Sequence, residues 1–109
     1  MLAYGGAVNY RGTTTVTIND CVFKGNKALK QNNINGLGGA IKFNTGTWTI
    51  DGCTFSGNVA TKGDTNGHDI KMSTTTTLPT IKNSTFNPAN VRDSEGTANA
   101  YKDGGGNKQ

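Results

Sequence analysis

The stretch TINDCVFKGN at residues 17–26 returns as TIDGCTFSGN at residues 49–58. A weaker version, TIKNSTF, follows at residues 80–86. The phenylalanine of the motif therefore recurs after 32 and then 31 residues. A fixed period of this length is typical of stacked structural repeats, because each unit buries its apolar face against the next. The sequence predicts an extended repeat protein rather than a domain built around one thick core.

A second motif opens each copy of the repeat. It reads GGAV at residues 5–8, GGAI at residues 38–41 and, in a weaker form, GHDI at residues 67–70. Paired glycines before a small residue suit a tightly curved path where two backbones come close together. With both motifs as landmarks, the predicted repeats cover residues 4–36, 37–66 and 67–90.

Apolar residues of the first copy fall into pairs that are two positions apart, Val16 with Ile18 and Cys21 with Phe23. Residues two apart face the same way on a strand, and a polar bend breaks the phase between the pairs. Val8, after the glycines, supplies a third strand. The predicted fold class is all-β, a parallel β-helix (solenoid) of about three rungs with three short strands per rung. The predicted core consists of Val8, Val16, Ile18, Cys21, Phe23, Ile41, Trp48, Ile50, Cys53, Phe55, Ile70, Ile81 and Phe86.

The composition fits this fold. Only 32% of the 109 residues are apolar and the mean hydropathy is −0.55, so a thick core of the ordinary kind cannot form. Threonine favours strands, while glycine and asparagine favour turns. No apolar stretch is long enough to span a membrane, and no window has the apolar spacing of a helical repeat.

The net charge is +4 and the pI about 9.2, but the lysines are scattered and no aromatic residues interleave with them. Nucleic-acid binding is therefore not predicted, whereas a mild attraction to anionic glycans or cell surfaces stays open. No signal peptide precedes the first glycine motif. We expect either a piece of a longer protein whose secretion signal lies elsewhere, or a short protein that completes itself by assembly.

Several side chains should stack into columns if the repeats are in register. Asn26 and Asn58 each stand three residues after a phenylalanine, and stacked asparagines can bond to one another and to buried backbone groups. Cys21 and Cys53 would lie about 4.8 Å apart; we expect small inward-facing thiols, because a disulfide between neighbouring parallel strands would be strained. The residues predicted to form structural columns are Asn26, Asn58, Phe23, Phe55, Phe86, Cys21 and Cys53.

Two segments interrupt the regularity, residues 27–37 (KALKQNNINGL) and residues 61–66 (TKGDTN). Insertions between stacked repeats gather on one face, which is often the binding face. Residues 91–109 are predicted to form an imperfect last rung or a cap that ends in a flexible tail from residue 103. Binding is expected in the first interrupting segment, at Lys27, Lys30, Gln31, Asn32, Asn33 and Asn35.

The glycine motifs at residues 5–8 and 38–41, with FKGN at residues 23–26 and FSGN at residues 55–58, carry a family resemblance. The sequence resembles the polymorphic outer-membrane proteins, autotransporter adhesins of chlamydiae, and the wider group of adhesin-like right-handed β-helix proteins. The resemblance covers about residues 4–90, and the third copy departs from both motifs. It implies a right-handed parallel β-helix in a secreted passenger that displays a rod on the cell surface and binds host or neighbouring cells.

Many right-handed β-helices act on polysaccharides through clustered carboxylates or a calcium site on one face. Asp20 and Asp51 could come within reach of each other on adjacent rungs, but an aspartate at a bend usually caps its own backbone. His68 is the only histidine, and no second imidazole or thiol is placed to complete a metal site. No catalytic, cofactor-binding or metal-binding residue is predicted, and we do not expect an enzyme.

Two further alternatives concern the surfaces of the predicted solenoid. Thr15, Thr17, Thr47 and Thr49 should stack in an outward array that resembles the face of ice-binding solenoids, although strand propensity alone also explains them. Open strands at both ends invite end-to-end pairing, which yields a filament when it does not close.

The sequence thus predicts an extracellular or cell-surface structural and adhesive module, a rod-forming segment of an adhesin-like protein. Its expected partners are other rungs, copies of itself stacked end to end, and a host-cell or glycan surface. We expect no nucleic acid, no cofactor and no membrane insertion by this segment. The open alternatives are a self-assembling filament subunit, a fragment of a polysaccharide lyase or hydrolase, and an ice-binding protein.

Overall fold

The computed structural model describes residues 5–30, 35–87 and 89–109, and it has an all-β fold built from parallel strands. The first copy of the repeat forms β1 (Val8–Tyr10), β2 (Thr15–Asn19), β3 (Val22–Lys24) and β4 (Lys27–Ala28). The second copy forms β5 (Ile41–Phe43), β6 (Thr47–Asp51), β7 (Thr54–Ser56), β8 (Val59–Ala60) and the short helix α1 (Gly63–Asn66). The third copy forms β9 (Ile70–Met72), β10 (Thr80–Lys82) and β11 (Thr85–Asn87). The C-terminal segment adds β12 (Val91–Arg92) and β13 (Lys102–Asp103).

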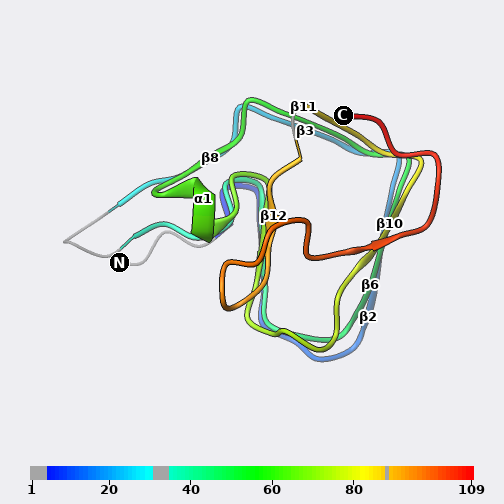
Figure 1. Cartoon of the computed structure of the whole chain (residues 1–109), viewed down its shortest axis with the longest axis horizontal. Coiled ribbons are helices and arrows are strands. Elements are labelled where there is room, and N and C mark those ends of the chain that lie inside the picture. The colour runs from blue at the N-terminus through cyan, green and yellow to red at the C-terminus, as the bar shows by residue number, and fades with distance from the viewer. Residues whose placement is uncertain (1–4, 31–34, 88) are drawn as a thin grey trace.

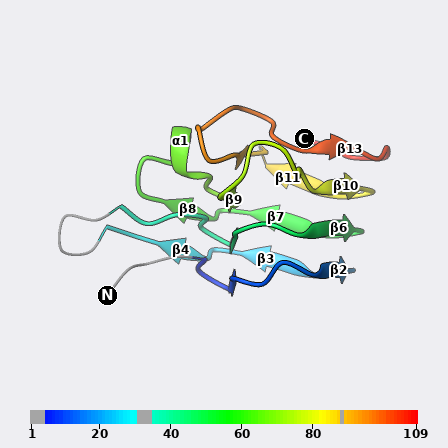
Figure 2. The same cartoon turned by 90° about the horizontal axis from the view of Figure 1, so that it is seen from below.

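Equivalent strands of successive copies pair with one another and form parallel sheets. The strand orders are β1-β5-β9-β12, β2-β6-β10-β13, β3-β7-β11 and β4-β8. Phe23 is in register with Phe55, and Phe55 with Phe86, which is the spacing of the sequence motifs. Figure 1 shows successive copies lying over one another, and Figure 2 shows them at successive levels, with the first copy at one end and the C-terminal segment at the other.

The bend between the second and third strand of each copy has a fixed backbone geometry. Asp20, Gly52 and Asn83 occupy equivalent places in the register, and their φ angles are 54°, 69° and 50°. This left-handed region favours glycine, asparagine and aspartate over other residues. The recurring bend residues are therefore explained by the left-handed backbone conformation that the bend requires.

The core consists of side-chain columns between the sheets. The rings of Phe23, Phe55 and Phe86 stack with centroids 4.9 and 4.8 Å apart. Such offset-stacked pairs contribute about 0.5–1.5 kcal/mol beyond the burial of their area. The predicted core residues that are buried are Phe23, Ile41, Trp48, Ile50, Cys53, Phe55, Ile70, Ile81 and Phe86.

The prediction missed a further column, formed by Phe43 and Met72. Both side chains are fully buried, and the two residues are in register with each other. Phe43 also stacks on Trp48 with ring centroids 4.3 Å apart. Each of the two stands two residues after a predicted core isoleucine, a spacing that already places it on the core face of the strand.

The first copy lies at one end of the stack, and its inward residues are less covered than their equivalents. Val16 and Ile18 are half-buried, whereas Ile50, which is in register with Ile18, is 0% exposed. The prediction that Cys21 belongs to the core is wrong, because Cys21 is exposed. Cys53, one level further in, is buried. The motif thus repeats the residue, while the position in the stack decides its burial.

The sequence predicted three strands per copy, but the first two copies have four in the described part of the chain. The additional strands β4 and β8 pair with each other. Together with α1 they form a protrusion on one side of the stack (Figure 1). Residues 27–28, the start of the first segment predicted to interrupt the regularity, therefore form a strand that stacks in register with the next copy. The third copy has no room for the protrusion, since only four residues lie between Phe86 and Val91.

The C-terminal segment covers the opposite end of the stack. β12 pairs with β9, β13 pairs with β10, and Lys108 forms a bridge with Thr85. Between β12 and β13 the chain crosses over the end of the stack (Figure 1). The N–H of Asn83 donates to the carbonyl oxygen of Gly105 at 2.8 Å. Residues 103–109 are therefore paired with the third copy, which corrects the expectation of a flexible tail.

Candidate functional site

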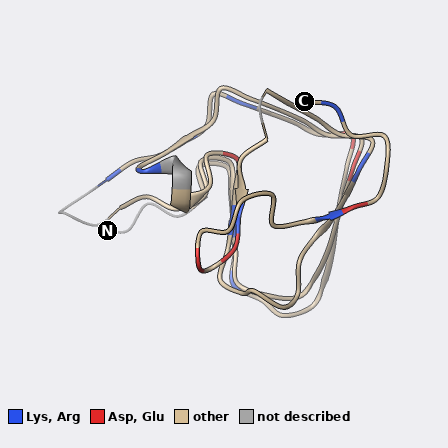
Figure 3. Cartoon of the chain, viewed as in Figure 1, with Lys and Arg blue, Asp and Glu red and all other residues tan. Residues whose placement is uncertain are grey.

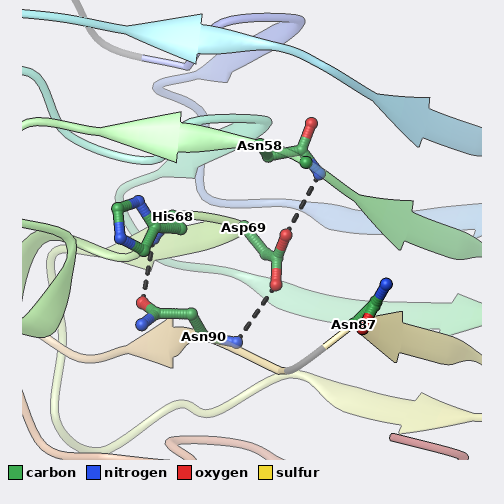
Figure 4. Close-up of a pocket in the computed structure, with 6 residues that line it drawn as sticks. Asn58, His68, Asp69, Asn87 and Asn90 are labelled. Carbon is green, nitrogen blue, oxygen red and sulfur yellow. Dashed lines mark hydrogen bonds between the residues drawn. The ribbon is translucent and has the colours of Figure 1, made fainter.

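A notch opens where the third copy leaves the protrusion of the second copy uncovered. It encloses about 100 Å³. Figure 4 shows the side chain of Asp69 between Asn58 and Asn90, with His68 on one side of it and Asn87 on the other. The lining residues are Gly57, Asn58, His68, Asp69, Asn87 and Asn90. All of these residues except Gly57 have polar side chains, and we take the notch as the candidate site.

Asp69 lies at the centre of the hydrogen bonds in the notch. Asn58 Nδ2 donates to Asp69 Oδ1, and the backbone N–H of Asn90 donates to Asp69 Oδ2, each at 3.0 Å. The backbone N–H of His68 donates to Asn90 Oδ1 at 2.9 Å. Both carboxylate oxygens therefore have a donor, and the network joins the second copy to the start and the end of the third copy.

The network replaces hydrogen bonds that a protrusion on the third copy would make. β8 pairs only with β4, so its other edge meets no strand among the described residues. On that edge, the N–H of Ala60 donates to His68 Nδ1 at 3.0 Å. This bond requires a neutral imidazole with its proton on Nε2. His68 and Asp69 stand where the first two copies have glycine and alanine, so the departures from the motif supply the groups that cap this edge.

Asn58 connects the notch to the asparagine column. Its Oδ1 accepts hydrogen bonds from the backbone N–H of Asn26 at 3.0 Å and from Asn26 Nδ2 at 3.1 Å. Its Nδ2 donates to the carbonyl oxygen of Phe23 at 3.0 Å. The structure thus brings together the two asparagines expected to form a column. The column ends at the third copy, which has Ala89 in place of the asparagine, and Asp69 takes the other Nδ2 proton of Asn58.

The environment of Asp69 favours its protonated form. Burial raises the pKa of this carboxyl, and the hydrogen bonds from Asn58 and Asn90 and the nearby His68 offset part of the rise. The residue is 4% exposed. A raised pKa in a cleft is a common mark of a functional site, and structural networks produce it too. Because both oxygens of Asp69 are engaged within the protein, the structural role is the better supported one.

The notch has the size and chemistry for a small polar group. Its volume equals that of a few water molecules, each of which occupies about 30 Å³ in the liquid. Among the described residues, Asp69 is the one carboxylate that lines it, whereas glycoside hydrolysis uses a pair. Within the described ranges, no group of three His, Cys, Asp or Glu residues could hold a metal ion. The geometry suits hydrogen bonding better than catalysis by paired carboxylates.

A line of cations crosses the sheet β1-β5-β9-β12 (Figure 3). Lys42 is in register with Lys71, and Lys71 with Arg92. Both lysines are buried, and burial lowers the pKa of each; for Lys42 the charge of Lys71 lowers it further. Lys71 Nζ donates to the carbonyl oxygens of Thr65 at 2.7 Å and Asp93 at 2.6 Å. This cation therefore ties α1 to the C-terminal segment.

The predicted binding residues belong to the protrusion. Lys27 lies in β4 and is exposed, Lys30 is exposed, and Asn35 is half-buried. None of these three lines the notch. Outside the described residues lie Gln31, Asn32 and Asn33.

The cysteine column continues into the third copy as a serine. The N–H of Cys53 donates to Ser84 Oγ at 3.1 Å, and Ser84 Oγ donates to the carbonyl oxygen of Lys82 at 2.9 Å. Cys21 and Cys53 are both free thiols. Burial raises the pKa of Cys53, which makes its thiol less reactive.

The threonine array is present in register. Thr15 pairs with Thr47 and Thr17 with Thr49, and Thr80 extends the second column. It is two columns wide on one sheet, because Asn19 and Asp51 occupy the next outward position along β2 and β6.

Sequence reasoning missed Asp69 and Asn90 as members of a site and considered His68 only as a metal ligand without partners. The third glycine motif gave a signal, since it replaces glycine and alanine with two groups that accept hydrogen bonds. What the sequence lacked was the location of the bare edge that they cap.

Comparison of the chain with family models, with curated proteins and with solved structures finds no match. Within the described residues, no helix combines the length and the apolar character needed to cross a membrane.

Proposed function

We propose that the chain forms a segment of right-handed parallel β-helix and serves as an extracellular structural and adhesive module. The observation that carries the proposal is the constant register of the parallel strands. Phe23, Phe55 and Phe86 pair in sequence at the motif spacing, and each ring stacks on the next. A stack that keeps its register lengthens by adding copies, so it suits a rod.

The protrusion supports the adhesive part of the proposal. It lies on one side of the stack (Figure 1), and the third copy stacks without it. Stacking therefore does not require the protrusion. Leu29 is 47% exposed within it, beside the exposed Lys27 and Lys30. Surface insertions on a regular scaffold are a usual place for binding residues.

An adhesion assay tests this role. Beads coated with the chain are counted after washing on cells and on surfaces coated with anionic glycans. The test variant combines Lys27→Ala, Leu29→Ser and Lys30→Ala, which removes two cations and one apolar side chain from the protrusion. Bead retention should fall several-fold, because a few anchor side chains that become buried on binding carry most of the energy of an interface.

The matched control removes the same kinds of side chain elsewhere, with Val22→Ser, Lys24→Ala and Lys102→Ala. Val22 is 69% exposed, and both lysines are exposed. The control should bind like the unaltered chain. Equal loss in both variants, or no retention of the unaltered chain on any surface, would show that the protrusion is not adhesive.

A further inference from the structure

The two ends of the stack differ in chemistry. We call the end formed by β1, β2, β3 and β4 the first-repeat face. Among the described residues, each of these strands is at the edge of its sheet. The large side chains of this face that point toward the core carry no charge, and all of them except Phe23 are only partly buried. They are Val8, Tyr10, Val16, Ile18 and Phe23.

On the outer edge of the first-repeat face, backbone N–H and C=O groups pair with no strand among the described residues. The N–H of Thr47 donates to the carbonyl oxygen of Thr14, and the N–H of Asp20 donates to the carbonyl oxygen of Asp51. The backbone N–H and C=O groups of the even-numbered residues of β2 therefore face β6. Peptide groups alternate in direction along a strand. Those of residues 15, 17 and 19 therefore point away from β6 and meet no partner strand among the described residues. An edge of this kind is a template for pairing with another chain.

The opposite end is closed by polar groups. Asp103 is in register with Ile81, so a carboxylate continues that apolar column. Asn107 Nδ2 donates to the carbonyl oxygen of Ile81 at 2.8 Å, and Tyr101 lies over Phe86 with ring centroids 6.3 Å apart. An apolar face gains little by meeting a carboxylate. Head-to-tail stacking into a filament is therefore disfavoured.

We propose that the first-repeat face binds the same face of a second copy of the chain. In this dimer two stacks meet end to end and both outer ends carry the polar C-terminal segment. A two-fold axis brings a surface into contact with the same surface of the other copy. Any charge at its centre would then lie near a like charge, and the uncharged centre of the first-repeat face avoids this repulsion. The whole chain, with its protrusion, measures 39 × 27 Å in the two directions across the stack, so the first-repeat face is at most of the order of the roughly 800 Å² per partner that stable interfaces bury. The inference rests on the proposed β-helix and specifies how it would be extended.

Sedimentation velocity over a dilution series tests the dimer. At high concentration the mass should be twice the 11.4 kDa of one chain, and it should fall to one chain on dilution. Thr17→Pro removes from β2 an N–H that points away from β6, a change that edge strands tolerate. This variant should stay monomeric. Thr17→Ala keeps the N–H and should dimerise like the unaltered chain.

Labelling of the Cys21 thiol gives a second readout that does not depend on how a variant folds. Cys21 is exposed on the first copy, whereas Cys53 is buried. The rate of Cys21 labelling should fall several-fold as the protein concentration rises, because the second copy covers the face. A constant labelling rate, a monomer at every concentration, a mass above two chains, or a Thr17→Pro dimer as stable as that of Thr17→Ala would each overturn the proposal. Absence of cooperative unfolding and of a β-type circular dichroism spectrum would instead overturn the proposed β-helix.

Discussion

Asp69 accepts a hydrogen bond from the side-chain amide of Asn58 at the level where the asparagine column ends. The first two copies have alanine at the position of Asp69. Between the first two copies the side-chain amide of Asn26 donates to the side-chain oxygen of Asn58. At the third copy the carboxylate of Asp69 is the acceptor in place of an asparagine. The repetition therefore ends through residues that depart from the motif at the places where partners are missing.

The Asp69→Ala variant restores the alanine of the first two copies and tests the pH dependence of stability. Burial raises the folded-state pKa of Asp69 above its ordinary value of 3.8, so folding favours the protonated carboxyl. The resulting stabilisation is fully present below the unfolded-state pKa and is lost as pH rises through the raised folded-state pKa. The wild type should therefore lose stability relative to the variant by about 1.4 kcal/mol for each unit by which the pKa is raised.

Urea unfolding of both proteins between about pH 3 and pH 8 measures this difference in the free energy of unfolding. If the stability of the wild type relative to the variant stayed constant with pH, or increased with pH, the assignment would be contradicted.

His68 should act as the cap of the β8 edge. In His68→Ala the N–H of Ala60 loses its acceptor, and leaving a buried donor unsatisfied costs about 1–3 kcal/mol. His68→Asn places a side-chain oxygen near the former Nδ1 and should recover at least half of the loss. Thermal or urea unfolding gives the free energies. Equal loss in the two variants would show that the ring is needed for packing and not for the hydrogen bond.

The sequence predicted the register of this fold well because the information is local and repeated. The motifs that contain Phe23, Phe55 and Phe86 differ by nearly constant steps, and parallel pairing at those steps places like residues on one another. The strands β4 and β8 were missed because two residues are too short to show a period. The burial of Cys21 was predicted wrongly because it depends on how many copies cover it, which no motif encodes.

The site was less predictable than the fold because it depends on relations between distant segments. His68 caps an edge only because the third copy omits the protrusion beside Ala60, and that omission becomes visible once the strands are assigned. The C-terminal segment posed a similar problem. Its glycines look like a linker, yet Gly105 and Gly106 have φ angles of 98° and 71°, and the segment bends there and pairs with the third copy.

Phe55 should contribute more to stability than Phe23. Phe55 is 0% exposed and stacks on rings at both sides, whereas Phe23 is 7% exposed and stacks on one. Phe55→Ala should cost about 3–5 kcal/mol, the usual range for a buried phenylalanine, and Phe23→Ala clearly less. The comparison is made by urea unfolding at a concentration where the chain is monomeric. A larger loss at Phe23 would contradict the order of the copies in the stack.

Ser84 should be needed for its hydroxyl rather than for its size. Its Oγ accepts the N–H of Cys53 at 3.1 Å, and the residue is 0% exposed. Ser84→Ala leaves that buried N–H unsatisfied and should cost about 1–3 kcal/mol. Ser84→Cys restores the residue of the first two copies and keeps a weak acceptor, so its loss should be smaller. If alanine were as stable as serine, the hydrogen bond would make no net contribution.

Truncation after Lys102 should unprotect a defined set of amides in the third copy. The N–H of Asn83 donates to Gly105 at 2.8 Å, and the N–H of Phe86 donates to Lys108 at 2.8 Å. In the full chain both amides should exchange slowly with solvent, while in the truncated chain both should exchange at rates near those of an open edge. The N–H of Thr85, which donates to Cys53 at 2.8 Å on the other side of the strand, serves as the internal control and should stay protected. Hydrogen exchange followed by NMR separates the three sites. If Asn83 and Phe86 exchanged fast in the full chain as well, residues 103–109 would be a free tail and the polar end of the stack would be absent in solution.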